Sequence, residues 1–269
     1  MTVLTAATIT VLPDGAAGAV VVCGSHGGRY PGYRTALAGL RAVILNDAGV
    51  GRDAAGIGAL GYLDELGIAA ATVSNTSARI GEPDDMLRHG VISHVNTPAR
   101  NVGVTVGDAC ADAAERLTAA PLVAVEPPAV SEGRAVVDLE AGGRIVLVDS
   151  AAMVTADDAG AVVVTGSHGA IVGGDPRKAL QVDAAAAVFN DAGFGVDDVG
   201  VTRLPVLQQR GIAAFTVAVE SARIGEAASS YRHGVISAVN PLAEAGGARV
   251  GEAAAPVLER WARRAGGVG

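Results

Sequence analysis

Aromatic side chains are scarce in this chain: phenylalanine, tryptophan and tyrosine together make up 3% of its 269 residues. The apolar content is therefore mostly alanine, valine, leucine and isoleucine, small side chains that let helices pack closely on a sheet. Cysteine is nearly absent too, because the chain has only Cys23 and Cys110, and they lack the spacing of metal ligands. We expect reduced thiols in a cytoplasmic protein.

An excess of basic residues is also missing. The formal net charge is −8, so the chain lacks the clustered lysine and arginine that bind nucleic-acid phosphates. No apolar run approaches the about 18 residues that cross a bilayer, and the first residues lack the basic segment of a signal peptide. The sequence predicts no nucleic-acid or membrane partner, and its abundant alanine is compatible with a homo-oligomer.

The chain does contain an internal repeat of four polar motifs. The first copies are GSHG at 24–27, NDAG at 46–49, SARIGE at 77–82 and RHGVIS at 88–93, and the second copies are at 166–169, 190–193, 221–226 and 232–237. The spacing between copies is 142 residues for the first motif and 144 for the other three. This predicts a duplicated domain, with residues 1–125 as the first repeat and 126–269 as the second. A proline-bearing segment at about 119–133 reads as the linker.

The order of apolar and polar segments predicts an α/β fold. Short runs of valine, isoleucine and alanine end in glycine-bearing segments and are followed by helical spacing, as in βα units of a mostly parallel sheet. Expected strands are 4–11 (weakly), 19–23, 42–45 and 68–73, then 145–148, 161–165, 186–189 and 212–217. Expected helices are 33–40, 53–66 and 106–117, then 176–182, 199–209 and 250–264. We expect two similar halves related by a pseudo-twofold axis.

In an open parallel sheet, the loops after the strands form the binding crevice. Ser25 and His26, like Ser167 and His168, follow such a strand between glycines. Glycine lets backbone N–H groups face an oxyanion, and histidine is a general acid or base near its natural pKa. Adjacent Ser and His point in different directions, so they do not form a nucleophile–base pair with each other. The alternative is a turn in which the histidine only bonds the backbone.

Asp47 and Asp191 come directly after strands, where a carboxylate orients a histidine or acts as a base. We predict them as catalytic, with the neighbouring Asn46 and Asn190 binding substrate. The same residues also close turns and cap helices at little cost, which is the alternative.

Arg79 and Arg223 offer planar guanidinium groups that anchor a carboxylate or phosphate. The alternative is an internal ion pair of Arg79 with Asp47 or Glu82, repeated by Arg223 with Asp191 or Glu226 in the second half. Two further pairs of residues join the predicted binding set, namely Ser77 with Ser221 and His89 with His233. The histidines alternatively stabilise the carboxyl end of a helix.

A metal or nucleotide cofactor is not predicted. His26, Asp47 and His89 have the atom types of a divalent metal site, but no short ligand spacing supports one. The glycine segments match neither a P-loop nor a dinucleotide fingerprint. Asp149 in the second half aligns with Ala7 in the first. This asymmetry fits one cleft shared by the two halves, which we favour, or unconstrained drift between the copies.

The resulting hypothesis is an enzyme that hydrolyses an amide or ester bond in a small, carboxylate-bearing metabolite. An isomerase or lyase that moves a proton next to a carboxylate, and a non-catalytic small-anion binding protein, are the alternatives. The predicted catalytic residues are Ser25, His26, Asp47, Ser167, His168 and Asp191, and the predicted substrate-binding residues are Asn46, Ser77, Arg79, His89, Asn190, Ser221, Arg223 and His233.

Overall fold

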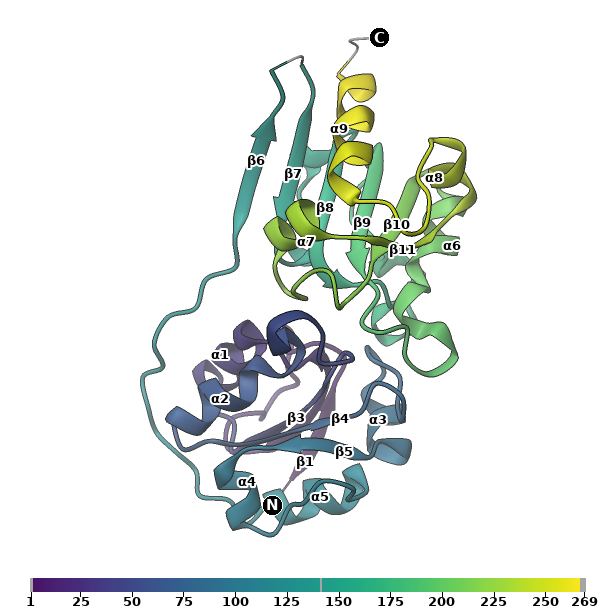
Figure 1. Ribbon diagram of the computed structural model, residues 1–269. Helices are drawn as coiled ribbons and strands as arrows, with labels where there is room; N and C mark the ends of the chain where they lie inside the picture. The colour runs from purple at the N-terminus through teal and green to yellow at the C-terminus, as the bar shows by residue number, and fades with distance from the viewer. Residues whose placement is uncertain (1, 141, 267–269) are drawn as a thin grey trace.

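The computed structural model describes residues 2–140 and 142–266, which form two α/β units joined by an extended segment (Figure 1). The sheet of the first unit has the order β1-β2-β3-β4-β5. Its strands are β1 (Val3–Ala6), β2 (Val20–His26), β3 (Ala42–Asn46), β4 (Ala69–Val73) and β5 (Ile92–Val95). The first four are parallel, and β5 runs antiparallel at the edge.

The second unit repeats this arrangement and adds one strand, giving the order β11-β10-β9-β8-β7-β6. Its strands are β6 (Arg134–Asp138), β7 (Arg144–Val148), β8 (Val162–His168), β9 (Ala186–Asn190), β10 (Ala213–Val217) and β11 (Ile236–Val239). Strands β7 to β10 are parallel, while β6 and β11 are antiparallel edges.

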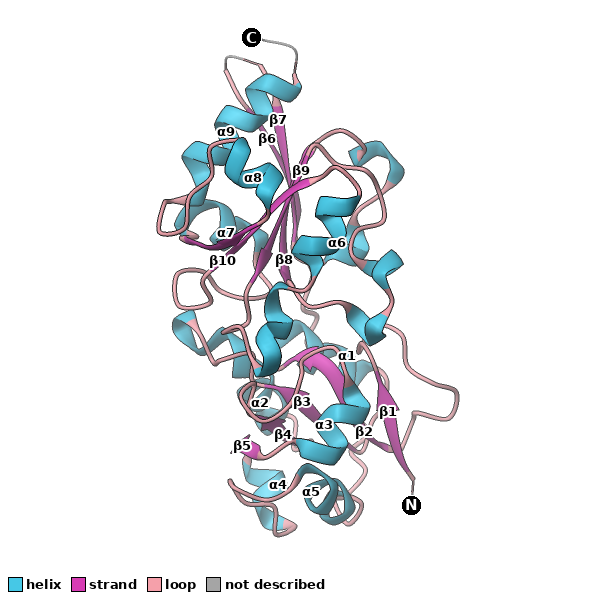
Figure 2. Ribbon diagram, turned by 90° about the vertical axis from the view of Figure 1, so that its right-hand side faces the viewer, coloured by secondary structure: helices cyan, strands magenta, loops and turns pink. Residues whose placement is uncertain are grey.

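Helices cover both faces of each sheet, as Figure 2 shows for the second unit, where α7, α8 and α9 lie opposite α6. The α-helices are α1 (Arg29–Leu37), α2 (Gly58–Glu65), α3 (Pro83–His89), α4 (Thr97–Asn101) and α5 (Cys110–Leu117), then α6 (Arg203–Gln209), α7 (Ala227–His233), α8 (Pro241–Ala245) and α9 (Ala254–Ala265). Among the described residues, no helix is both long and apolar enough to cross a bilayer.

The alternation of side chains along β2 explains this two-sided burial. Val20 and Val22 enter one apolar cluster with α3 and α5, whereas Val21 and Cys23 enter another with α1 and α2. Successive side chains of a strand point to opposite faces, so a strand covered on both sides reads as continuously apolar. The expected α/β class and mostly parallel sheets are confirmed.

Several expected elements differ in extent. Segment 4–11 is a strand only up to Ala6, because Thr8 pairs back to Val11 in a tight turn. The expected helix 33–40 begins at Arg29 and ends at Leu37, just before Gly39 adopts a φ of +62°. The expected helix 176–182 is only a 3₁₀ turn over Pro176–Lys178. The antiparallel edges β5, β6 and β11 were not expected.

The GSHG motif does not leave the strand as a loop, as the sequence had suggested. In β2, Val22 pairs with Ile44 and His26 pairs with Asn46, so three residues of β2 face one residue of β3. The same irregularity occurs in β8, before His168. A bulge of this kind bends a strand and re-aims its side chains. The serine and histidine of each copy therefore lie on a bulged strand end.

Candidate functional site

The repeated NDAG turns pack the two units against each other. Ala48 and Ala192 belong to one apolar cluster with Ile80 and Ile224, so the cluster draws on both units. A Cβ atom added to Gly49 would lie only 3.3 Å from the Cα atom of Gly193, which leaves no room for a larger residue. These turns therefore form the contact between the units.

Backbone strain is concentrated at this contact. The described non-glycine residues with positive φ fall at equivalent positions of the two units: Ala48, Val50, Asp53 and Ala54, and Ala192, Phe194, Asp197 and Asp198. Such conformations cost free energy and persist where the surrounding structure fixes them. The two units thus use the same strained turn to meet one another.

Arg79 and Arg223 connect the units through reciprocal ion pairs. Arg79 pairs with Asp197 of the second unit and, at 2.6 Å, with Asp85 in helix α3 of its own unit. Arg223 Nε lies 2.7 Å from the carboxylate of Asp53 in the first unit. Internal ion pairs were the alternative role for both arginines. Arg79 pairs with neither Asp47 nor Glu82, whereas Arg223 does pair with Glu226, at 3.5 Å. Neither arginine lines the cavity described below.

The NDAG aspartates and asparagines bond the backbone of their own turns and of the loop after the next strand. Asp47 Oδ1 accepts the N–H groups of Gly49 and Asn75 at 3.0 and 2.9 Å, and Asp191 does the same with Gly193 and Val219. Burial raises the pKa of Asp191. The side chains of Asn46 and Asn190 are fully buried and bond backbone groups as well. None of these four lines the cavity.

The remaining predicted binding residues also lie away from the cavity. Ser77 Oγ donates to the carbonyl of Ser74 at 2.8 Å and accepts the N–H of Val91, and Ser221 repeats these bonds. His89 and His233 are exposed and are the last residues of α3 and α7. The structure therefore does not bring Asp47, Arg79 and His89 together around His26, as the sequence had suggested.

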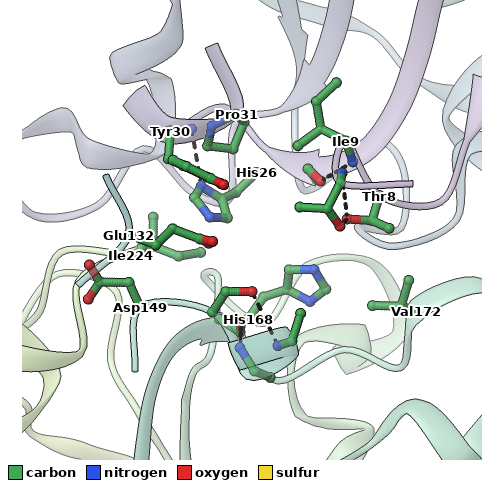
Figure 3. A pocket seen from close by; sticks show the side chains of 18 of the residues that line it. Thr8, Ile9, His26, Tyr30, Pro31, Glu132, Asp149, His168, Val172 and Ile224 are labelled. Carbon is green, nitrogen blue, oxygen red and sulfur yellow. Dashed lines mark hydrogen bonds between the residues drawn. The ribbon is translucent and has the colours of Figure 1, made fainter. Parts of the chain in front are cut away.

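The structure does bring together the serines and histidines of the two copies. A cavity of about 720 Å³ lies between the units and is lined by Ser25, His26, Ser167 and His168. Figure 3 shows His26 entering from the first unit and His168 from the second. The expectation of a cleft shared by the two halves agrees with this lining, and the volume suits a small-molecule ligand.

Each unit covers the histidine of the other with its SARIGE loop. A Cβ atom on Gly225 would lie 3.1 Å from His26 Cε1, and one on Gly81 would lie 3.7 Å from His168 Cε1. Each loop is also bonded to its own unit. In the first unit, the N–H of Gly81 donates to the carbonyl of Gly24 in β2. The two copies of this loop therefore occupy equivalent positions, each beside the cavity histidine of the other unit.

His26 is neutral near pH 7. Its Nδ1 accepts the N–H of Gly28 at 3.1 Å, and burial lowers its pKa to about 4. The ring is half-buried and faces the cavity, so water still reaches it. Because Nδ1 accepts a hydrogen bond, the proton of the neutral ring is on Nε2. His26 thus offers a hydrogen-bond donor to a ligand.

His168 differs from His26 in its hydrogen bonding. It is 7% exposed, and its Nδ1 has no partner among the described residues. Burial, followed by the positive charge of Arg203, holds its pKa well below the usual range. Ala170 stands where the first unit has Gly28. A Cβ atom on Gly28 would lie 2.6 Å from the His26 ring, so Ala170 excludes the corresponding ring position in the second unit.

Ser25 and Ser167 are held by the turns that follow β1 and β7. Ser25 Oγ accepts the N–H of Ile9 at 3.0 Å, and Ser167 Oγ accepts the N–H of Ala151 at 2.8 Å. Each hydroxyl keeps its own hydrogen to donate. These contacts fix the serines at the cavity wall.

Arg203 is a cavity residue that the sequence did not reveal. It is 3% exposed, donates to the carbonyls of Ala170 and Ala179, and lies 4.7 Å from the ring centroid of Phe189. Burial lowers its pKa to about 10, so it is charged at neutral pH. No carboxylate of the described residues forms an ion pair with it. The equivalent residue in the first copy is Ala59. Aligning the two copies would therefore have shown that only the second carries this arginine.

Seven further charged residues line the cavity: Arg29, Asp53, Glu132 from the linker, Asp149 after β7, Arg177, Lys178 and Glu226. Burial raises the pKa of Glu132, a hydrogen bond with Tyr30 lowers it, and the negative charge of Asp149 raises it, so that the pKa is raised overall. Within residues 2–140 and 142–266, no three His, Cys, Asp or Glu side chains are grouped as metal ligands.

Searches of protein-family models, curated proteins and solved structures find no significant match to this chain.

Proposed function

We propose that the cavity between the units binds a small, carboxylate-bearing molecule and that the protein hydrolyses an amide or ester bond in it. The observation that carries the proposal is Arg203, a buried cation at the cavity wall without a carboxylate partner among the described residues. Burying an unpaired charge costs on the order of several kcal/mol. A ligand carboxylate in the cavity would offset that cost.

The neutral His26 supports a role in stabilising charge on the substrate. Its Nε2–H is a donor on the cavity side, and a neutral imidazole can hydrogen-bond a carbonyl oxygen as negative charge develops there. In hydrolysis this is the oxygen of the tetrahedral intermediate. His26 would therefore stabilise the oxyanion rather than remove a proton.

His168 is the proposed general base. Its Nδ1 has no hydrogen-bond partner among the described residues, so this nitrogen can accept a proton from an attacking water. Its pKa is low partly because Arg203 is close. A substrate carboxylate that neutralises Arg203 would raise that pKa and make His168 a stronger base in the complex.

A non-catalytic small-anion binding protein is the second candidate. The low pKa of both histidines favours it, because a weakly basic imidazole is a poor proton acceptor at neutral pH. The same property argues against an isomerase or lyase, which must remove a proton from carbon.

We further propose that the two units arose by duplication and are related by a pseudo-twofold axis, since their motifs, strained turns and ion pairs are reciprocal.

Thermal-shift measurements with a panel of small carboxylates, carboxylated amides and esters test the proposal. Stabilisation should be present in the wild type, absent in Arg203→Gln, and retained in Arg249→Gln, whose guanidinium is exposed and bonds only carbonyls. Compounds that stabilise the protein are then assayed for hydrolysis. If no carboxylate stabilises the wild type, or if Arg203→Gln responds equally, the proposal is wrong. Binding without any turnover would favour the second candidate.

A further inference from the structure

One end of the cavity carries two carboxylates. Glu132 comes from the linker, and Asp149 follows β7; Figure 3 shows both on the same side of the cavity. The N–H of Gly133, the residue after Glu132, donates to Asp149 Oδ2 at 2.6 Å, which holds the two acidic residues near one another. No Lys, Arg or His of the described residues forms an ion pair with either one.

Asp149 also has a structural role. Its two oxygens accept the N–H groups of Gly133 and Ala227, which fasten the linker and the start of α7. Each carboxylate oxygen has two lone pairs, so both can still accept a bond from a ligand. Burial of Glu132 raises its pKa, a hydrogen bond with Tyr30 lowers it, and the repulsion from Asp149 raises it, so that the pKa is raised overall. A bound cation would offset the cost of holding these two carboxylates together.

The other end of the cavity is basic. Lys178, the only lysine of the chain, lies close to Gly173, because a Cβ atom added to that glycine would be 3.8 Å from Lys178 Nζ. Gly173 follows Val172, which Figure 3 shows on the side of the cavity away from Glu132 and Asp149. Lys178 forms no ion pair with a described carboxylate.

The histidines lie between these two ends. His168 is nine-tenths buried, lines the cavity, and leaves Nδ1 without a partner among the described residues. Arg203 is close enough to influence its titration. An unsatisfied buried polar atom is rare in a folded protein unless a ligand or an ion completes it. The charged ends and the unpartnered ring therefore belong to one binding site.

We propose that the substrate is zwitterionic, with an ammonium group bound by Glu132 and Asp149 and a carboxylate bound by Arg203 and Lys178. The inference rests on the proposed function and names its substrate class. In this orientation the bond to be cleaved lies between the two charges, beside His26 and His168. A single negative charge would satisfy only the basic end.

Isothermal titration calorimetry with four ligands of matched chain length tests the assignment. They are δ-aminovalerate (zwitterion), valerate (monoanion), glutarate (dianion) and cadaverine (dication), and the same series is repeated with longer chains. We expect the zwitterion to bind on the order of tenfold or more tightly than the monoanion, as one additional charge pair worth about 1.4 kcal/mol would give. Glu132→Gln should remove this preference, whereas Glu126→Gln, an exposed linker residue outside the cavity lining, should keep it.

The outcomes separate the two proposals. Equal affinity for δ-aminovalerate and valerate overturns the zwitterion and leaves the anion site standing. Tighter binding of glutarate than of δ-aminovalerate does the same. If no ligand of any length binds the wild type, both the zwitterion and the proposed function are overturned at this cavity. Loss of carboxylate binding in Lys178→Met, with cadaverine binding unchanged, would support the assignment of the basic end.

Discussion

Arg79 reaches across the boundary between the two units to pair with Asp197, and Arg223 returns the contact to Asp53. Although both arginines have the chemistry of a substrate anchor, their charges are already matched within the protein. The hydrogen bond that Arg79 donates to Asp197 raises the pKa of Arg79, and the one that Arg223 donates to Asp53 raises the pKa of Arg223. The SARIGE motif, one of the two six-residue motifs that are identical in both copies, therefore serves the contact between units.

We expect Arg79→Ala combined with Arg223→Ala to lower the melting temperature slightly while leaving carboxylate-dependent stabilisation intact. The pairs are largely exposed, so their contribution is small and decreases with salt. Thermal shift at low and high ionic strength, with and without a stabilising carboxylate, measures both effects. Loss of the carboxylate-dependent stabilisation in this variant would contradict this assignment and indicate that the arginines bind the substrate.

Gly28 and Ala170 offer a matched pair of substitutions beside the two histidines. Gly28→Ala places a Cβ atom 2.6 Å from the His26 ring, so the ring must move and lose the bond from the Gly28 N–H. We expect ligand affinity and any turnover to fall at least tenfold, with a small change in stability. Ala170→Gly should instead allow the corresponding bond to His168.

Nitrogen NMR of the imidazole rings gives the direct readout for this pair. In the wild type, His26 should show the pattern of the Nε2–H tautomer. That pattern should change in Gly28→Ala, and a defined tautomer should appear for His168 in Ala170→Gly. An unaltered His26 signal in Gly28→Ala would contradict the steric explanation.

The sequence was sufficient to predict the α/β class, the parallel strands and the four repeated motifs, because burial on both faces produces continuous apolar runs. It did not reveal β5, in which only Ile92 is fully buried and Ser93 and His94 interrupt the apolar pattern. It also did not reveal that NDAG and SARIGE face the other unit. A repeat shows that two copies share contacts, but not whether those contacts are made within a copy or between copies.

Arg203 was missed for a different reason. A single arginine at the start of a helix usually extends its charge to solvent, and nothing local distinguishes a buried one. Only its neighbours in the fold, Ala170, Ala179 and Phe189, show that it is enclosed. The serines and histidines were found because both copies keep them at the same bulged strand ends.

Ser25 and Ser167 separate a covalent from a water-mediated hydrolysis. We expect Ser25→Ala to retain turnover and to lose about 1–2 kcal/mol of stability, because the buried N–H of Ile9 would lose its acceptor. Ser167→Ala should cost a similar amount through Ala151. Chemical denaturation and steady-state assays measure the two effects. Complete loss of turnover in one variant, with an acyl adduct on the wild-type serine seen by mass spectrometry, would identify a nucleophile instead.

The stability of the protein should fall as the pH decreases from about 6.5 to about 4. Burial lowers the pKa of His26 from 6.5 in the unfolded chain to about 4 in the folded protein, so the unfolded state binds more protons in that interval. The stabilisation is fully present above pH 6.5 and is lost as the pH falls towards the folded pKa. The loss of folding free energy caused by protonating His26 is at most about 3 kcal/mol. Water in the cavity makes the actual loss smaller, because the ring is only half-buried. His168 acts in the same direction.

Urea denaturation between pH 7.5 and 4.5 (about the interval over which free histidine titrates) measures this dependence. The His26→Gln variant should show a shallower decrease than the wild type, and His26→Gln combined with His168→Gln a shallower one still. The exposed His89 supplies the control, since His89→Gln should leave the slope unchanged. An unchanged slope in the double variant would mean that folding does not lower the pKa values of the two histidines, which would contradict their burial as neutral rings.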